Sequence, residues 1–146
     1  MIMKKHIERI ENIFSKNIDN LTIETLGNFN LFCGKYENGQ YDIFNSLGLG
    51  TDCVKIIDEI LFSAHHSELH KEIKFIFNNI KKYNHQIFAT TQRYDVIQTF
   101  AEVAQEYKDI EAYYYRLGRS AIPSDNNRSV VSMYTVDELI EATSKN

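Results

Sequence analysis

Apolar positions along the chain change their spacing several times, and each change predicts a different element. Over residues 67–83 they recur every three or four residues, as in a helix buried on one face, and the same spacing predicts a second helix over residues 94–107. Two apolar runs without alternation, VKIID at 54–58 and QIFAT at 86–90, are typical of strands covered on both faces. Strand, helix and strand in this order predict a βαβ unit with two parallel strands.

The N-terminal part of the chain predicts one helix followed by short strands. Met3, Ile7, Ile10 and Phe14 would share one face of an amphipathic helix. Between residues 21 and 44, short apolar runs alternate with Gly and Asn turns, which predicts two or three short strands.

The C-terminal part predicts a hairpin and a last helix. The runs IEAYYYRL (110–117) and RSVVSMYT (128–135) are rich in aromatic and β-branched residues, and a polar loop with the only proline, Pro123, joins them. We expect them to pair at the edge of the sheet. Thr135 and Glu138 have the T-x-x-E spacing of a capping box, which predicts a helix start.

These elements predict one α/β domain over residues 1–146, with helices flanking a small, largely parallel sheet that ends in an antiparallel hairpin. The length of 146 residues suits one core, and no linker divides it. A net charge of -4 disfavours binding to nucleic acid. Cys33 and Cys53 lack CxxC spacing, and no apolar run is long enough for a signal peptide or a membrane span, which predicts a cytoplasmic protein.

The acidic pair Asp58-Glu59 follows the apolar run at 54–57. In parallel α/β sheets, ligands bind beyond the carboxyl ends of the strands, where this pair is expected to lie. Acids at such a position can hold Mg²⁺ and orient or deprotonate a water. By itself such an acidic dipeptide is more often part of a solvated turn than of a functional site. The surrounding sequence is therefore needed to distinguish the two.

Six segments around the acidic pair occur in an order found in one family. They are SLGLG (46–50), IIDEI (56–60), AHHS (64–67), QIFATTQRYDVIQTFAE (86–102), YYYRL (113–117) and VVSMYTVDELIEA (130–142). Together they resemble the C-terminal half of ABC-type ATPases related to the overcoming-lysogenisation-defect proteins and, more distantly, to SMC heads. The resemblance implies a truncated P-loop ATPase core over residues 42–146, preceded by an N-terminal helix and short strands over residues 1–41.

The resemblance also implies roles for single residues. Asp58 falls on the Walker B acid that associates with magnesium, and Glu59 falls on the catalytic glutamate. Three more residues fall on a signature-like loop, which in the family contacts the γ-phosphate of a nucleotide held by a partner subunit: Ser46, Gly48 and Gly50.

Three departures from the family indicate that this site is not catalytic. No G-x-x-x-x-G-K-[ST] occurs, and GKYENGQ (34–40) does not supply the lysine of a P-loop. Gln92 replaces the family's switch histidine and cannot carry its charge. Only residues 51–53 separate SLGLG from the Walker B strand, where the family has a whole helix. We therefore expect Asp58, Glu59 and Gln92 to be vestigial, with no cofactor bound by this chain alone.

Two other groups of residues suggest sites. His66 and His70 would share a helix face, and His65 precedes them, but a zinc site needs four ligands, so a partly exposed helix cap is favoured and no metal is expected. The aromatic run at the start of the predicted hairpin is a candidate interface, either for a protein partner or for self-association through a sheet edge: Tyr113, Tyr114 and Tyr115.

A preserved sheet with a dismantled ATPase site predicts a non-catalytic protein-binding regulator or decoy. The resemblance implies a phage or mobile-element inhibitor of an ATP-dependent host defence complex, with an ATPase or a second copy as partner. The alternative is a trans-acting subunit that supplies Asp58 and Glu59 to Mg-ATP held by a P-loop partner. A third reading is a homodimeric structural remnant.

Overall fold

The computed structural model describes residues 5–13, 21–34, 53–125 and 128–144. Its elements, in chain order, are β1 (Ile10–Ile13), β2 (Leu21–Ile23), β3 (Phe29–Cys33), β4 (Val54–Ile57), the 3₁₀ turn η2 (His66–Glu68), α2 (Leu69–Tyr83), β5 (Gln86–Thr90), α3 (Tyr94–Ala104), β6 (Ala112–Arg119), the 3₁₀ turn η3 (Pro123–Asp125), β7 (Ser129–Tyr134) and α4 (Val136–Ser144).

Five strands form the central sheet in the order β4-β5-β3-β6-β7. The first four run parallel, and β7 pairs antiparallel with β6. This arrangement confirms the predicted α/β fold with a largely parallel sheet and a C-terminal hairpin. It also confirms the predicted βαβ unit, because β4 and β5 are neighbours joined through α2.

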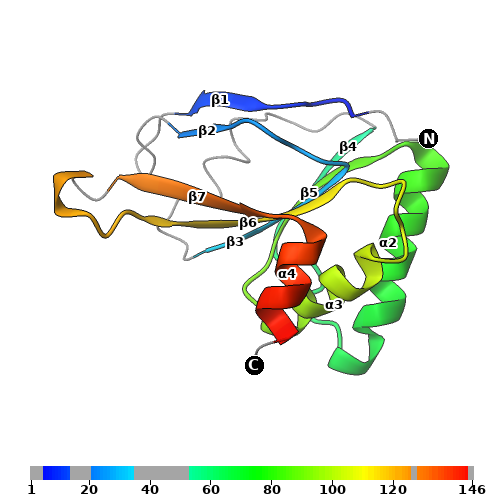
Figure 1. Ribbon diagram of the computed structural model, residues 1–146. Helices are drawn as coiled ribbons and strands as arrows, with labels where there is room; N and C mark the ends of the chain where they lie inside the picture. The colour runs from blue at the N-terminus through cyan, green and yellow to red at the C-terminus, as the bar shows by residue number, and fades with distance from the viewer. Residues whose placement is uncertain (1–4, 14–20, 35–52, 126–127, 145–146) are drawn as a thin grey trace.

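The sheet lies between two layers (Figure 1). Helices α2, α3 and α4 cover one face, and the two-stranded ribbon β1-β2 covers the other. On the helix face, the rings of Phe77 and Phe100 lie 5.1 and 5.0 Å from the ring of Phe29. On the ribbon face, Phe32 stacks on Tyr115 with 4.7 Å between ring centroids. Each face of the sheet thus has its own apolar core.

Strand β3 occupies the middle of the sheet, between β5 and β6. Its apolar residues alternate between the two cores, with Phe29 and Leu31 on the helix face and Phe32 on the ribbon face. The sequence predicts a short strand in this region but not its central position. The sheet is thus built around a strand from residues 1–41, the part of the chain that precedes the resemblance.

The predicted N-terminal helix is wrong for the residues that the structure describes. Residues 5–9 have no regular structure, and Ile10 begins β1, which pairs with β2. Ile7 and Ile10, three residues apart, both pack in the core on the ribbon face without forming a helix. Their spacing alone therefore does not identify a helix. Met3 and Phe14, the other two predicted helix positions, lie outside the described residues.

The hairpin strand β6 is an interior strand, so the sheet edge predicted at Tyr113, Tyr114 and Tyr115 is wrong. Strand β6 pairs with β3 on one side and β7 on the other. Tyr114 is 7% exposed and Tyr115 is 0% exposed, each in one of the two cores. Tyr113 is half-buried beside Tyr115. β-rich aromatic runs occur in interior and edge strands alike, which explains the error.

Strand β4 begins the sheet at the opposite end from β7. Apart from Val54 its residues are half-buried, so the predicted coverage of both faces is wrong for β4, whereas all five residues of β5 are buried as predicted.

Candidate functional site

The carboxyl ends of β4 and β5 meet through the side chain of Thr90. Its hydroxyl donates to Asp58 Oδ1 at 2.6 Å and accepts the backbone N–H of Glu59 at 2.7 Å. The carbonyl of Thr90 accepts the N–H of Ile60 at 2.8 Å. The acidic pair is therefore fixed to the end of β5, as the sequence predicts for two parallel strands of one βαβ unit.

The two acids have different surroundings although both are exposed. One oxygen of Asp58 is occupied by Thr90, whereas the carboxylate of Glu59 makes no hydrogen bond or ion pair within the described residues. Glu59 also has a positive φ of 51°, and Leu61 has a φ of 57°. Such backbone conformations are uncommon for residues other than glycine and persist where the surrounding structure holds them.

The side chain of Arg93 holds the loop that follows β4, residues 58–64. Its Nη1 donates to three backbone carbonyls, those of Leu61 at 2.9 Å, Phe62 at 3.3 Å and Ala64 at 2.8 Å. Its Nε and Nη2 donate to the two carboxylate oxygens of Asp95 at 3.0 and 2.7 Å. The hydrogen bonds from Arg93 lower the pKa of Asp95 and, reciprocally, raise the pKa of Arg93, so both groups stay charged at neutral pH.

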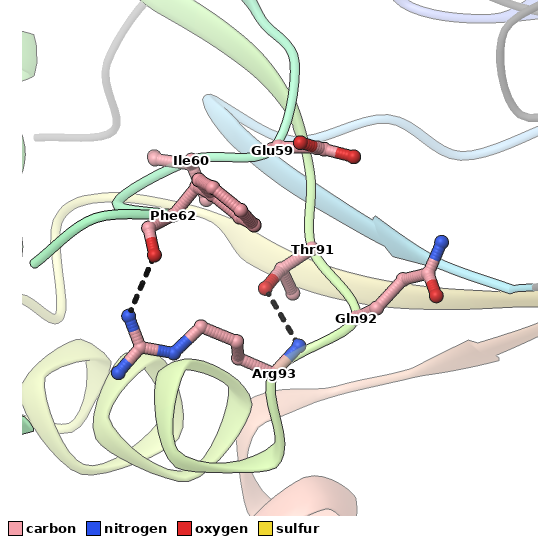
Figure 2. A pocket seen from close by; sticks show the side chains of 6 residues that line it. All are labelled: Glu59, Ile60, Phe62, Thr91, Gln92 and Arg93. Carbon is pink, nitrogen blue, oxygen red and sulfur yellow. Dashed lines mark hydrogen bonds between the residues drawn. The ribbon is translucent and has the colours of Figure 1, made fainter.

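A shallow pocket of about 190 Å³ lies between this loop and the start of α3 (Figure 2). Its lining consists of Glu59, Ile60, Phe62, Thr91, Gln92 and Arg93. Figure 2 shows Glu59 and Gln92 pointing away from Arg93, whose guanidinium is directed at the loop. Phe62 is 71% exposed.

The structure brings three of the sequence-predicted residues to one edge, namely Asp58, Glu59 and Gln92. The signature-like loop with Ser46, Gly48 and Gly50 lies outside the described residues, so its predicted role is untested.

The position of β3 adds one observation about the missing P-loop. Gly34 directly follows β3, the central strand, and a P-loop likewise follows a strand. In the sequence, Gly34 and Gly39 have the spacing of G-x-x-x-x-G, but Gln40 and Tyr41 stand where that motif has Lys and Ser or Thr. The lysine that would carry the positive charge is absent from the motif position.

One of the histidines after β4, His65, caps the start of the 3₁₀ turn η2. His65 precedes η2, and its Nδ1 accepts the N–H of Ser67 at 3.2 Å, as the predicted cap requires. His66 and His70 are exposed. Among the described residues, no group of three or more His, Cys, Asp or Glu side chains could hold a metal ion. Cys33 and Cys53 do not form a disulfide with each other.

Arg93 and Thr90 are the site residues that sequence reasoning missed. Both lie in QIFATTQR, within one of the six segments that carry the family resemblance, but the resemblance assigns neither of them a role. The one available signal is the spacing of Arg93 and Asp95 at a helix start, which allows an ion pair two residues apart.

Comparison with protein-family models, with curated proteins and with solved structures found no match for this chain. Within the part of the chain that the structure describes, no helix is both long and apolar enough to cross a membrane.

Proposed function

We propose that this chain is a non-catalytic protein-binding regulator that docks its partner at the carboxyl edge of β4 and β5. The observation that carries the proposal is the presentation of Phe62. This side chain is 71% exposed, and its own carbonyl and those of Leu61 and Ala64 are held by Arg93. A large aromatic side chain on a preorganised loop is a typical anchor for a protein interface, because little conformational entropy is lost on binding.

The charge around Phe62 specifies the chemistry of the partner. Glu59 leaves its carboxylate exposed next to this loop, whereas the charge of Arg93 is neutralised by Asp95. A partner that inserts an apolar side chain beside Phe62 and presents a Lys or Arg to Glu59 would complement this edge. Phosphoryl transfer, in contrast, needs cations to hold the phosphates. Among the described residues that line this pocket Arg93 is the one cation, and each of its three guanidinium nitrogens already donates to Asp95 or to a backbone carbonyl.

The family resemblance suggests which protein this partner is. An ATPase-like fragment with a docking edge could occupy the pairing surface of a complete ATPase head. The chain would then act in the cytoplasm as a phage or mobile-element inhibitor, or decoy, of an ATP-dependent defence complex. A second copy of the chain is the other candidate partner in this proposal.

Two exposed phenylalanines allow a matched test. The wild-type chain, Phe62→Ala and Phe75→Ala would each be immobilised and exposed to lysate of the native host. Phe75 lies on α2 and is 62% exposed, so its loss removes a similar apolar area away from the edge. We expect the wild type and Phe75→Ala to retain the same protein, with a basic surface, and Phe62→Ala to lose it. Equal retention by all three chains contradicts docking at this edge.

A trans-acting ATPase subunit is the second candidate, and the free carboxylate of Glu59 is the observation that favours it. Thr90 holds Asp58 while Glu59 remains unpaired in the described part of the chain, so Glu59 could act on nucleotide held by a P-loop partner. In a reconstituted pair, Glu59→Gln should then abolish ATP turnover without weakening assembly. Unchanged turnover would eliminate this candidate.

A further inference from the structure

A second pocket, of about 340 Å³, lies on the helix face beyond the carboxyl end of β3. Strands β3 and β6 form its floor, and α3 and α4 form its walls, with Gln92 at the rim that it shares with the first pocket. The hydroxyl of Tyr94 on α3 donates to the carbonyl of Thr143 on α4 at 3.2 Å, so the two walls are tied together. Cavities of several hundred Å³ are large enough for a small organic ligand.

Three aromatic rings line this pocket. Tyr114 and Tyr134 are cross-strand partners, and their ring centroids lie 5.5 Å apart at a tilt of 48°. Tyr94 adds a third ring from α3. Burial, together with the neighbouring Cys33, raises the pKa of Tyr114, so its hydroxyl stays protonated and neutral at physiological pH. These rings offer a flat apolar body a surface on which to pack.

Arg116 provides one positive charge at this pocket. It lies two residues after Tyr114 on β6, so both side chains face the same side of the sheet. Within the described residues, the guanidinium of Arg116 makes no hydrogen bond or ion pair. This differs from Arg93, whose donors are used by Asp95 and by backbone carbonyls. An unpaired guanidinium beside aromatic rings matches a planar carboxylate, which it can bind through two parallel hydrogen bonds.

We propose that this pocket binds a small monocarboxylate with a flat apolar body, the carboxylate on Arg116 and the body against Tyr94, Tyr114 and Tyr134. A single cation favours one negative charge over a phosphate dianion, which proteins usually bind with several donors and cations. This site goes beyond the proposed protein docking and does not depend on it, because its ligand contacts Arg116 rather than Phe62 or Glu59.

The test is an NMR titration of the full chain with benzoate, benzamide and inorganic phosphate. Benzoate and benzamide have the same shape, but only benzoate is charged. We expect benzoate to shift the amide signals of Tyr94, Arg116 and Thr143 with roughly millimolar affinity, as suits a ligand of this size. Benzamide and phosphate should each bind at least about tenfold more weakly, since each lacks one of the two features that the pocket recognises.

Three variants separate this site from general charge effects. Arg116→Gln should lower benzoate affinity at least about tenfold, whereas Lys108→Gln, an exposed position away from the pocket, should leave it unchanged. Ala142→Leu should also reduce binding, because Ala142 lines the pocket and a larger side chain would fill it while Arg116 is kept. The proposal is overturned if benzamide binds as well as benzoate, if Arg116→Gln has no effect, or if no shifts occur up to about 20 mM benzoate.

Discussion

Two glutamines near opposite ends of β5 differ in burial and contacts. They represent the amino edge of the sheet, where the parallel strands begin, and the carboxyl edge, where these strands end. Gln86 begins β5 and is completely buried, whereas Gln92 follows the end of β5 by two residues and is exposed. The amide of Gln86 accepts the N–H groups of His6 and Ile7 at 3.1 and 2.7 Å, and it donates to the carbonyls of Ile7 and Gly27 at 2.6 and 2.9 Å. Gln92 instead borders both pockets.

At the amino edge, the buried polar groups around Gln86 form hydrogen bonds with one another. Asn30 accepts the N–H of Gly27 at 2.7 Å and the hydroxyl of Tyr115 at 3.1 Å, and its amide donates to the carbonyls of Gly27 and Ile87. Gly27 lies so close to the backbone of Glu111 that a Cβ atom would overlap it. Within the described residues, these contacts fill the space around Gln86 and Asn30.

The carboxyl edge has the opposite character. Asp58, Glu59 and Gln92 are exposed, both pockets open here, and Arg116 carries an unpaired charge within the described residues. Arg93 and Thr90 make several hydrogen bonds here, and these hold the loop rather than fill the space. The polar residues around Gln86 and Asn30 thus stabilise the fold, whereas those of the carboxyl edge are accessible for binding.

The largest effect on stability is expected from Asn30→Ala. The substitution removes three buried hydrogen bonds to backbone groups and leaves the N–H of Gly27 without this partner, while the hydroxyl of Tyr115 keeps the carbonyl of Thr25 as its acceptor at 2.6 Å. We expect the free energy of unfolding to fall by about 3 kcal/mol, as measured by urea denaturation. A loss below about 1 kcal/mol would mean that water or other groups replace the amide, and that the amino edge is not closed.

The two glutamines give a direct comparison of the edges. Gln86→Ala should lower the free energy of unfolding by about 2 kcal/mol and expose Lys5 and Arg9 to trypsin, since the amide no longer holds residues 6 and 7. Gln92→Ala should change it by less than about 0.5 kcal/mol. Similar effects of the two substitutions would contradict the division between a structural and a binding edge.

Arg93→Ala should loosen the loop after β4 without unfolding the domain. We expect the amides of residues 60–64 to exchange hydrogen at least about tenfold faster, because three carbonyl contacts and the ion pair with Asp95 are lost. Arg116→Ala removes the same type of side chain from the same edge and serves as the control, with exchange in this loop unchanged. Equal exchange in both variants would show that Arg93 does not hold the loop.

The smallest effect is expected at the capping box of α4. Glu138 Oε1 accepts the N–H of Thr135 at 3.0 Å, and this backbone hydrogen bond lowers the pKa of Glu138. A lowered pKa in the folded state stabilises the protein above the ordinary pKa of a glutamate, and the contribution is lost as the pH falls through the folded-state pKa. Glu138→Ala should therefore lower the melting temperature slightly at pH 7 but not at pH 3. Asp137→Ala, which alters the neighbouring acid, should show a smaller difference between the two pH values.

The sequence predicts most of the elements because their apolar spacing is regular. The helix spacing of α2 and the uninterrupted runs of β4 and β5 identify the βαβ unit, and Thr135 with Glu138 identifies the start of α4. The acidic pair is also placed correctly, because the carboxyl ends of neighbouring parallel strands lie at one edge.

The remaining features depend on contacts between distant parts of the chain, which spacing does not encode. The segment of residues 5–13 is held against the sheet by hydrogen bonds to Gln86 and by packing in the core on the ribbon face, and it therefore does not form a helix. The central place of β3 and the burial of Tyr115 follow from pairing across the sheet. Arg93 likewise donates hydrogen bonds to three carbonyls that lie about 30 residues away in sequence. These contacts cannot be predicted from the sequence alone.

Calorimetric titration of the purified chain with Mg-ATP measures whether the carboxyl edge by itself binds a nucleotide, which a non-catalytic docking edge should not do. We expect no saturable heat up to millimolar nucleotide, and the same result for Asp58→Ala. Saturable binding that Asp58→Ala removes would contradict this expectation, because the acidic pair would then belong to a working nucleotide site.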